Sequence, residues 1–368
     1  MAAINGGVGS SKSGKSGSFC EPEPSVLCGQ TVTETVVLMD DLLCTDRVDS
    51  NTPDDVLTTL NAAIKVVGKD AVIDCKGHTV HQLTSKSAAA ANCKKGPGPS
   101  DVDNNKRKAM KETYDLYYQV GIWLVDGASA INCKVEQFYD GFFVQNGGEV
   151  KKSEASRNRR GINIQDEDNS GSDLSSKIAD VNTHDNYDGI FVYDPSKEEN
   201  AVIIEDVTSK NNLRSGMTLR DSDITVKDSD FSHNDEYGIT ITGEVEDYPT
   251  MVKFDGSVTC HYNGNFGIEL RPGQSRRGSS PNFAEIRVMG VLNTSHNDKV
   301  GLDIAVNSDM VFTVADHGSF ISCQNDSDIR NNPPTTFTFV DEGTDADGYT
   351  CDVNNDATAT CVPCPTCT

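Results

Sequence analysis

The chain has 368 residues, which is enough for two average domains or for one repeat domain with tails. Its 56 acidic residues outnumber the 32 lysines and arginines and give a net charge of -24, which repels nucleic acid and anionic membranes and favours cations. No stretch approaches the ~20 consecutive apolar residues of a membrane-spanning helix. We therefore expect neither nucleic-acid binding nor membrane insertion, and the composition leaves the oligomeric state open.

The two ends of the chain differ in composition from its middle. Residues 1–19 are rich in Gly, Ser and Lys, lack the apolar segment of a signal peptide, and predict a flexible tail. The 12 cysteines lie mostly toward the ends, so we expect an N-terminal cap over residues 20–60 and a Cys-rich C-terminal segment over residues 331–368, held by disulfides rather than by zinc. With sequons at Asn293 and Asn325, this favours an extracellular or cell-wall glycoprotein; either a leader has been removed or the secretion argument fails.

Between these ends the sequence repeats the pattern Gly, apolar, any residue, apolar. It begins at Gly121, Gly141, Gly161, Gly189, Gly216, Gly238, Gly267 and Gly301. The repeats are 20 to 34 residues apart, and second alternating segments such as AVIIEDV stand between them. Each repeat predicts short strands joined by polar bends, with too little room for a helix, and strands that pair from coil to coil make a parallel β-helix. We expect this β-helix to span residues 61–330, with an insertion over residues 86–119 that is either a lid or a disordered loop.

A polar corner precedes each repeat glycine. Such corners often require a positive φ, and we expect the glycines to supply it. Four residues earlier stand the members of a predicted stack of side chains that hydrogen-bond the turns: Asp185, Asn212, Asn234, Asn263 and Asn297. We interpret His184, His233 and His296, one residue further upstream, as bend residues, because coils two apart are separated by ~9.6 Å, too far for one metal ion.

The repeat region resembles the right-handed parallel β-helix superfamily, the pectate-lyase-like fold, in its short-repeat secreted form. The resemblance rests on VIDCKGHTV in the opening coil and on SHNDEYGITI and SHNDKVGLDI in later coils. The segment CGQTVTETVVLMDDLLC, from Cys28 to Cys44, is similar to the entry segment of secreted algal and microbial members. The resemblance implies an all-β, right-handed parallel β-helix solenoid with disulfide-rich terminal segments. It implies no single activity, because the superfamily includes lyases, hydrolases, epimerases and inert structural proteins.

Alternation along each strand assigns its side chains to two faces. The first and third residues after each glycine are apolar and are expected to point inward, so the second and fourth point outward. The second residue supplies our candidate substrate-binding residues: Trp123, Phe143, Asn163, Phe191 and Asp303. Aromatic faces and planar polar groups recognise extended sugars, so we expect an extracellular acidic polysaccharide as partner, with an ordinary solvated sheet face as the alternative.

The same face supplies candidate catalytic residues for a polysaccharide lyase or uronate epimerase: Tyr193, Arg220, Glu269 and Arg271. Such chemistry needs an arginine or a metal to neutralise the uronate carboxylate, and a base to remove the neighbouring proton. The alginate-epimerase branch of the superfamily carries Asp-Pro-His-Asp, whereas here Asp194-Pro195 is followed by Ser196-Lys197. The Asn-Thr-Asp and Gly-His-Gly signatures of pectin hydrolases are absent. The rival expectation is therefore a non-catalytic wall, matrix or adhesion protein.

The fifth residue after the glycine is acidic in several coils, including Asp166, Asp194 and Asp221. If the coils are in register, these carboxylates lie about one strand spacing apart and repel each other by ~1 kcal/mol even in water. Bridging by Ca²⁺ would relieve that repulsion, so these three are candidate calcium ligands. Divergent side chains with water between them are the alternative, and residues 166–173 lack the distal Glu of a calcium loop.

Overall fold

The structure is a computed structural model, and every regular element among its described residues is a β-strand. It describes residues 2–4, 28–45, 61–83, 119–165, 175–193, 202–243, 250–272, 282–305, 308–315, 318–322, 325–331, 336–341, 349–350 and 353–354. Among these residues there is no helix long and apolar enough to cross a membrane.

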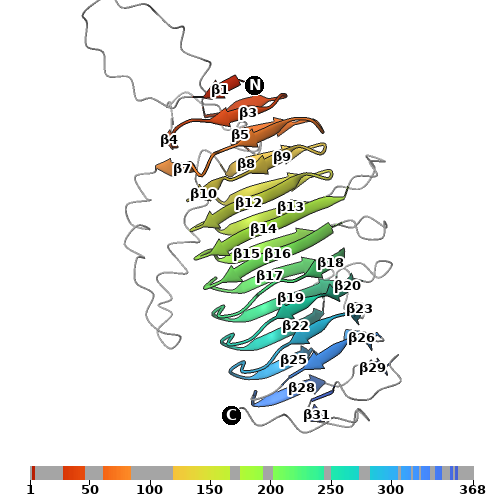
Figure 1. Cartoon of the computed structure of the whole chain (residues 1–368). Helices are drawn as coiled ribbons and strands as arrows, with labels where there is room; N and C mark the ends of the chain where they lie inside the picture. The colour runs from red at the N-terminus through yellow and green to blue at the C-terminus, as the bar shows by residue number, and fades with distance from the viewer. Residues whose placement is uncertain are drawn as a thin grey trace, which may run out of the picture.

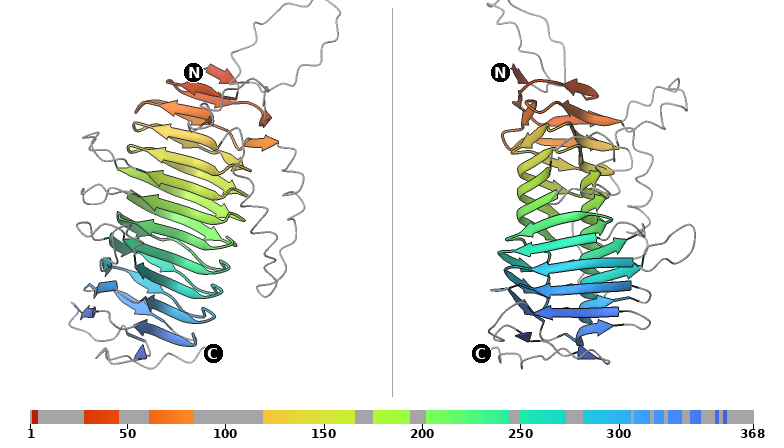
Figure 2. Two further views of the ribbon diagram at one scale, coloured as in Figure 1. Left: turned by 180° about the vertical axis from the view of Figure 1, so that it is seen from behind. Right: turned by 90° about the vertical axis from the view of Figure 1, so that its right-hand side faces the viewer.

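The strands stack along one axis from the N-terminus to the C-terminus and form two long parallel sheets and one short one (Figures 1 and 2). Sheet B holds β2 (Gln30–Val32), β5 (Ala62–Val67), β8 (Val120–Val125), β11 (Asp140–Gln145), β13 (Arg160–Gln165), β15 (Asp188–Tyr193), β17 (Ser215–Arg220), β19 (Tyr237–Gly243), β22 (Phe266–Pro272), β25 (Val300–Ile304), β28 (Ser327–Asn331) and β31 (Val353–Asn354). Sheet A holds β1 (Ala2–Ile4), β3 (Val36–Leu38), β6 (Val72–Asp74), β9 (Ser129–Ile131), β12 (Glu149–Ser156), β14 (Ser176–His184), β16 (Val202–Lys210), β18 (Asp223–Lys227), β20 (Thr250–Asp255), β23 (Asn282–Val288), β26 (Ser308–Val314) and β29 (Thr336–Asp341), with β4 (Leu42–Thr45), β7 (Thr79–Leu83) and β10 (Lys134–Glu136) beside them. The short sheet holds β21 (Ser257–Thr259), β24 (Val291–Asn293), β27 (Ser319–Ile321) and β30 (Tyr349–Thr350).

The sheets extend on both sides of the range expected for the solenoid. Before residue 61, β2 pairs with β5, β3 with β6 and β4 with β7. After residue 330, β29 and β31 continue sheets A and B. The tail over residues 5–19 and the insertion, except for Gln119, lie outside the described residues.

The core lies between the sheets and is built by the alternation that the sequence predicts. The first and third residues after each repeat glycine, such as Ile190 and Val192, are fully buried and belong to one continuous apolar cluster. Equivalent residues pair from coil to coil, as Phe142 does with Ile162 and Ile162 with Ile190. Each such side chain contributes roughly 1.5–3 kcal/mol by leaving water, so the stacked aliphatic rows fix the register of the coils.

The repeat glycines are required for close approach and not, as expected, for positive φ. None from Gly121 to Gly267 has a positive φ. A Cβ at Gly189 would lie 2.0 Å from Ser209 Oγ and 2.5 Å from the carbonyl oxygen of Gly216 in the next coil. The left-handed conformation belongs instead to residues earlier in the corner, such as His233, whose φ is 59°.

The predicted stack of corner side chains exists, with one member shifted. The backbone N–H of Asn212 donates to Asn234 Oδ1 at 3.1 Å, and the backbone N–H of Asn234 donates to Asn263 Oδ1 at 2.9 Å. Asn158, Asn186, Asn297 and Asn325 continue the ladder in the same way. Asp185 was the wrong residue, because in its coil the ladder position is Asn186, three residues before the glycine, and Asp185 takes the left-handed corner at φ 56°.

Two disulfides lie at the N-terminal end of the described chain. Cys28 is bonded to Cys44, and Cys75 to Cys133. Cys260 is a free thiol in the core, where burial raises its pKa well above the usual value. Disulfides in the terminal region are thereby confirmed at this end, whereas the cysteines after residue 350 lie outside the described residues.

Candidate functional site

The candidate site residues lie on the outer face of sheet B. The second residues after the glycines, such as Phe143, are absent from the core cluster although they are shielded from solvent. The residue just before each glycine faces the same way: Tyr237, Phe266 and Val300 form an apolar cluster of their own, separate from the core. The residue pairs between neighbouring strands skip the glycine. The residue before the glycine points outward and the residue after it points inward, so strict alternation is broken at the glycine.

The N-terminal part of this face is aromatic, as expected. The rings of Trp123 and Phe143, on adjacent strands, have centroids 5.6 Å apart, and Lys65 Nζ lies 4.0 Å above the Trp123 ring. Asn163 and Phe191 follow on the next two strands, opposite one another in the ladder. The predicted row Trp123, Phe143, Asn163 and Phe191 is therefore continuous across four strands.

Carboxylates and arginines that the sequence analysis did not select border this row. Asp140 accepts a hydrogen bond of 2.8 Å from Asn163 Nδ2 and lies 3.7 Å from Arg160 Nη1. Asp188 accepts two hydrogen bonds of 2.6 Å from Arg214, one on each oxygen. Burial raises the pKa of Asp140 to about 6 although Arg160 lowers it, and burial also raises the pKa of Asp188.

The four candidate catalytic residues form two separate pairs. The Arg220 guanidinium lies 5.0 Å from the centre of the Tyr193 ring on the adjacent strand. Glu269 and Arg271 form an ion pair within β22. Arg220 pairs with Thr242 and Thr242 with Arg271, so the two arginines are two strand spacings apart, about 9.6 Å. The four candidate catalytic residues therefore lie on one face but at two separate places along it.

Further charged and aromatic side chains surround the pair of Glu269 and Arg271. We call the whole group the Glu269 cluster: Tyr237, Glu269, Arg271, Asp303 and Arg330. Arg271 contacts the carboxylate of Glu269 and lies 4.5 Å from the centre of the Tyr237 ring. Asp303 is opposite Glu269 on the next strand and accepts a hydrogen bond of 2.5 Å from Arg330 Nε. Two carboxylates, two guanidiniums and one phenol thus gather on four neighbouring strands.

The protonation states of this cluster suit acid–base chemistry near neutral pH. Glu269 is only 7% exposed, and burial raises its pKa to about 7; Arg271 lowers this pKa, and Asp303 raises it. Burial also raises the pKa of Tyr237, helped by the negative charge of Glu269. At neutral pH the phenol keeps its proton while Glu269 exchanges one readily, which is the property of a general acid and a general base.

The calcium prediction stays a prediction, because the described residues include only one of its three candidate ligands. Asp166 and Asp194 lie outside the described residues, and no group of three potential ligands that could hold a metal ion occurs within them. Asp221 is buried, with its Oδ2 4.0 Å from Arg220 Nε. Its φ is 46°, and Asp126 and Asn146 at the same repeat position are also left-handed. Asp and Asn tolerate that conformation best among non-glycine residues, which is one physical reason for these residue types at this repeat position.

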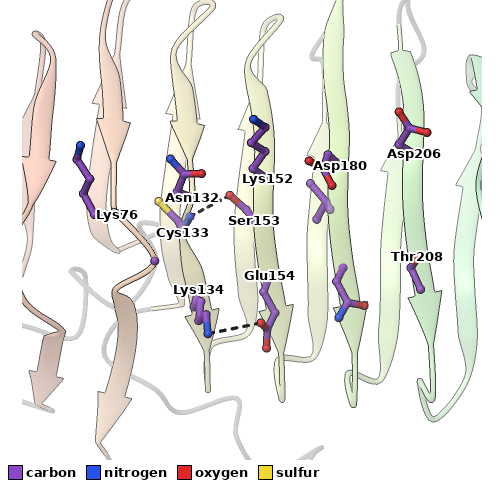
Figure 3. Close-up of a pocket in the computed structure, with 13 residues that line it drawn as sticks. Lys76, Asn132, Cys133, Lys134, Lys152, Ser153, Glu154, Asp180, Asp206 and Thr208 are labelled. Atoms are coloured by element: carbon purple, nitrogen blue, oxygen red, sulfur yellow. Dashed lines mark hydrogen bonds and ion pairs between the residues drawn. The ribbon is translucent and has the colours of Figure 1, made fainter.

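A groove of 950 Å³ crosses the outer face of sheet A and contains none of the predicted site residues (Figure 3). Lys76, Lys134 and Lys152 line its N-terminal half, and Asp180 and Asp206 lie at the other end. Lys134 Nζ is 4.0 Å from Glu154 Oε2 in a solvent-exposed pair. Exposed pairs of this kind contribute little energy, and the groove lies on a different sheet from Glu269.

Comparison with known proteins agrees with the observed fold. The family model of the right-handed β-helix region matches residues 100–250, so this part of the chain is similar to that family. The stacked parallel sheets confirm the predicted all-β, parallel β-helix solenoid. No curated protein sequence matches this β-helix significantly.

Three solved structures are similar to this chain at low sequence identity. The A-module of a mannuronan C-5 epimerase from Azotobacter vinelandii is 11% identical, with a TM-score of 0.47 over 83% of this chain and 80% of the other. A periplasmic alginate epimerase is 13% identical, with a TM-score of 0.48 over 85% of this chain and 70% of its own. A pectate lyase is 12% identical, with a TM-score of 0.41 over 83% and 71% of the two chains.

Proposed function

We propose that this β-helix binds an extracellular acidic polysaccharide along the outer face of sheet B and modifies bound uronate units by β-elimination or epimerisation at the Glu269 cluster. The observation that carries the proposal is the convergence of Glu269 and Tyr237 on one guanidinium, that of Arg271. A base, an acid and a group that neutralises a carboxylate are the three requirements of this chemistry.

Each residue takes a role that follows from its surroundings. A bound uronate carboxylate competes with Glu269 for Arg271, and the guanidinium stabilises the negative charge that develops when the neighbouring C–H bond breaks. Glu269, released from its ion pair, accepts that proton. In β-elimination the glycosidic C–O bond breaks as the new C=C bond forms, and Tyr237 donates its proton to the leaving oxygen. In epimerisation Tyr237 instead returns a proton to the opposite side of the same carbon.

Arg330 and Asp303 are positioning groups in this proposal. Their hydrogen bond holds Asp303 beside Glu269, where its charge favours the protonated form of Glu269. The pair Tyr193 and Arg220 offers a further phenol and guanidinium two to three strands away, which we assign to substrate binding.

The test incubates the protein with pectic, alginate and sulfated polysaccharides, with Ca²⁺ or chelator, and follows the ultraviolet absorbance of new unsaturated ends. NMR of the product reports epimerisation, which creates no unsaturated end. We expect turnover that falls at least 100-fold in Glu269→Gln and in Arg271→Met. Glu205→Gln is the matched control, because Glu205 is also ion-paired but lies on sheet A.

Two outcomes would redirect the assignment. Loss of turnover in Tyr193→Phe and Arg220→Ala, with Glu269→Gln active, would move the chemistry to the other pair. Absence of any turnover, with binding retained, would leave a glycan-binding protein without this activity.

A non-catalytic wall or matrix component is the second candidate function, and one observation favours it. The carboxylates described above on the outer face each lie beside an arginine: Asp140 by Arg160, Asp188 by Arg214, Glu269 by Arg271 and Asp303 by Arg330. Charges compensated in this way also suit a rigid surface with no chemistry. Affinity for polysaccharide without product formation in either assay would favour this candidate.

A further inference from the structure

The outer face of sheet B holds a second polar site at its N-terminal half, which the proposed acid–base chemistry does not use. Asp140, at the start of β11, is 2% exposed. Its Oδ2 accepts the hydrogen bond from Asn163, but its Oδ1 receives none in the described part of the chain. The nearest cation, Arg160, lies 3.7 Å from Oδ1, which is beyond hydrogen-bond distance.

A buried donor without an acceptor lies nearby. Trp123 Nε1 is buried and, like Asp140 Oδ1, has no hydrogen-bond partner within the described residues. Trp123 is two strands from Asn163 in the same row, with Phe143 between them. Buried polar groups in folded proteins are nearly always paired, so an orphaned donor in the row and an orphaned acceptor beside it call for an explanation.

The chemistry of these orphans specifies a ligand. Asp140 Oδ1 can only accept a hydrogen bond while it is ionised, and Trp123 Nε1 can only donate one. A hydroxyl group satisfies either, and the C–H face of a pyranose ring packs on aromatic rings such as those of Trp123 and Phe143. A uronate carboxylate fits poorly, because it would bring a second negative charge against the buried carboxylate of Asp140.

We propose that Asp140, Asn163, Trp123, Phe143 and Arg160 form a recognition subsite for a neutral, hydroxyl-bearing sugar unit. Trp123 and Arg160 are partly exposed and form its rim, whereas Asp140 is buried. The inference rests on the proposed function only in taking the outer face of sheet B as the glycan-binding surface.

The position of the subsite narrows the substrate class. Five strand steps separate β11 from β22, so the Asp140 subsite lies about 24 Å from Glu269 along the face. A polymer that satisfies both places carries neutral units at a distance from its uronate units. The substrate is therefore a mixed heteropolysaccharide rather than a homopolymer of uronate.

The chain supplies its own reporter for this subsite. Trp123 is its single tryptophan, so tryptophan fluorescence responds to a ligand here and not at the Glu269 cluster. The experiment titrates the full chain with neutral gluco-, galacto- and manno-oligosaccharides, and in parallel with oligouronates of matched length. We expect a saturable fluorescence change with at least one neutral series, and a Kd at least tenfold higher in Asp140→Asn, which replaces the acceptor oxygen by a donor of similar shape.

Two controls keep the result specific. Asp206→Asn changes an exposed aspartate on sheet A, and Glu205→Gln changes an ion-paired glutamate on the same sheet; neither is expected to alter neutral-sugar binding. Thermal melting checks that Asp140→Asn folds. If it does not, calorimetric binding to Trp123→Phe, which keeps an aromatic ring and removes the N–H donor, is expected to show a several-fold loss.

Three outcomes would overturn the subsite: a fluorescence change with oligouronates alone, wild-type affinity in Asp140→Asn, or no response to any neutral series. Failure of the proposed function has a different signature, which is absence of turnover while neutral-sugar binding and its dependence on Asp140 remain.

Discussion

The buried carboxylates on the outer face of sheet B show burial outweighing attraction to a neighbouring cation. Asp140, Asp188 and Glu269 each have an arginine beside them, yet the pKa of each carboxyl group is raised. The lost hydration of a buried carboxylate is large, and a single guanidinium repays only part of it. These side chains therefore hold protons at pH values where exposed carboxylates are ionised.

These raised pKa values predict an unusual effect of pH on the stability of the protein. Because the pKa of Asp140 is raised from 3.8 to about 6 in the folded state, the folded protein binds more protons than the unfolded chain between these values. Its contribution to stability is present below pH 3.8 and is lost as pH rises through 6. We expect Asp140→Asn to be more stable than wild type at pH 8, by roughly 2–3 kcal/mol, and equal to it near pH 4. Urea denaturation at both pH values measures this.

The control for that prediction is Glu205, whose pKa is shifted in the opposite direction. Hydrogen bonding from Lys177 lowers the pKa of Glu205, so this carboxylate contributes stability above its unfolded pKa and Glu205→Gln should gain none at pH 8. A wild-type protein that is more stable than Asp140→Asn at pH 8 would contradict the assigned burial effect.

Arg271 offers a second test at the level of single residues. Its charge lowers the pKa of Glu269, which burial raises to about 7. We expect Arg271→Met to move the titration midpoint of the Glu269 carboxyl group above 7, as followed by carboxyl ¹³C NMR. A midpoint that falls would mean that Arg271 does not lie beside the carboxylate in solution.

At the scale of strands and corners, the sequence predicted the inward-facing residues but only part of the outward face. Residues such as Ile190 and Val192 are apolar at a period of two, and only one face can bury them. Asp140 and Tyr237 were missed because alternation breaks at the repeat glycine, which turns the preceding residue outward. The signal was present: a charged Asp140, Arg160 and Asp188 at that position cannot point into an aliphatic core.

The asparagine ladder yields a prediction at the same scale. Asn234→Ala removes the acceptor of the Asn212 backbone N–H and the donor to the carbonyl oxygens of Ser209 and Phe231. Buried groups left unpaired cost about 1–3 kcal/mol each, so we expect a loss of about 2–4 kcal/mol in the free energy of unfolding. Asn182→Ala, at an exposed strand position, is the control and should change little. If Asn234→Ala and Asn182→Ala changed the free energy of unfolding equally, the ladder would not be a specific source of stability.

For the whole molecule, the sequence predicted the solenoid because its registers agree, but it could not predict the pairing of cysteines. Cys75 and Cys133 are 58 residues apart because an insertion lies between their coils, and they are neighbours because those two coils stack on each other. Likewise, Glu269 and Arg271 are close in sequence, whereas Tyr237, Asp303 and Arg330 join them only when coils stack.

The two disulfides are expected to stabilise the fold by different amounts. In the chain-entropy model the 58-residue loop closed by Cys75–Cys133 stabilises the fold by about 4 kcal/mol, against about 3 kcal/mol for the 16-residue loop of Cys28–Cys44. Calorimetry should therefore show a larger fall in Tm for Cys75→Ser with Cys133→Ser than for Cys28→Ser with Cys44→Ser. The reverse order would indicate that the first coil melts independently of the rest.

The hydrogen bonds of the asparagine ladder also have one direction along the chain. Each ladder residue donates its backbone N–H to the side chain of the following coil, as Asn263 does to Asn297 and Asn297 to Asn325. While the ribosome is still producing the chain, the newest coil always holds a donor whose acceptor has not yet been made. Each coil thus supplies the acceptor for the coil before it, and its own ladder N–H has an acceptor only when the next coil is in place.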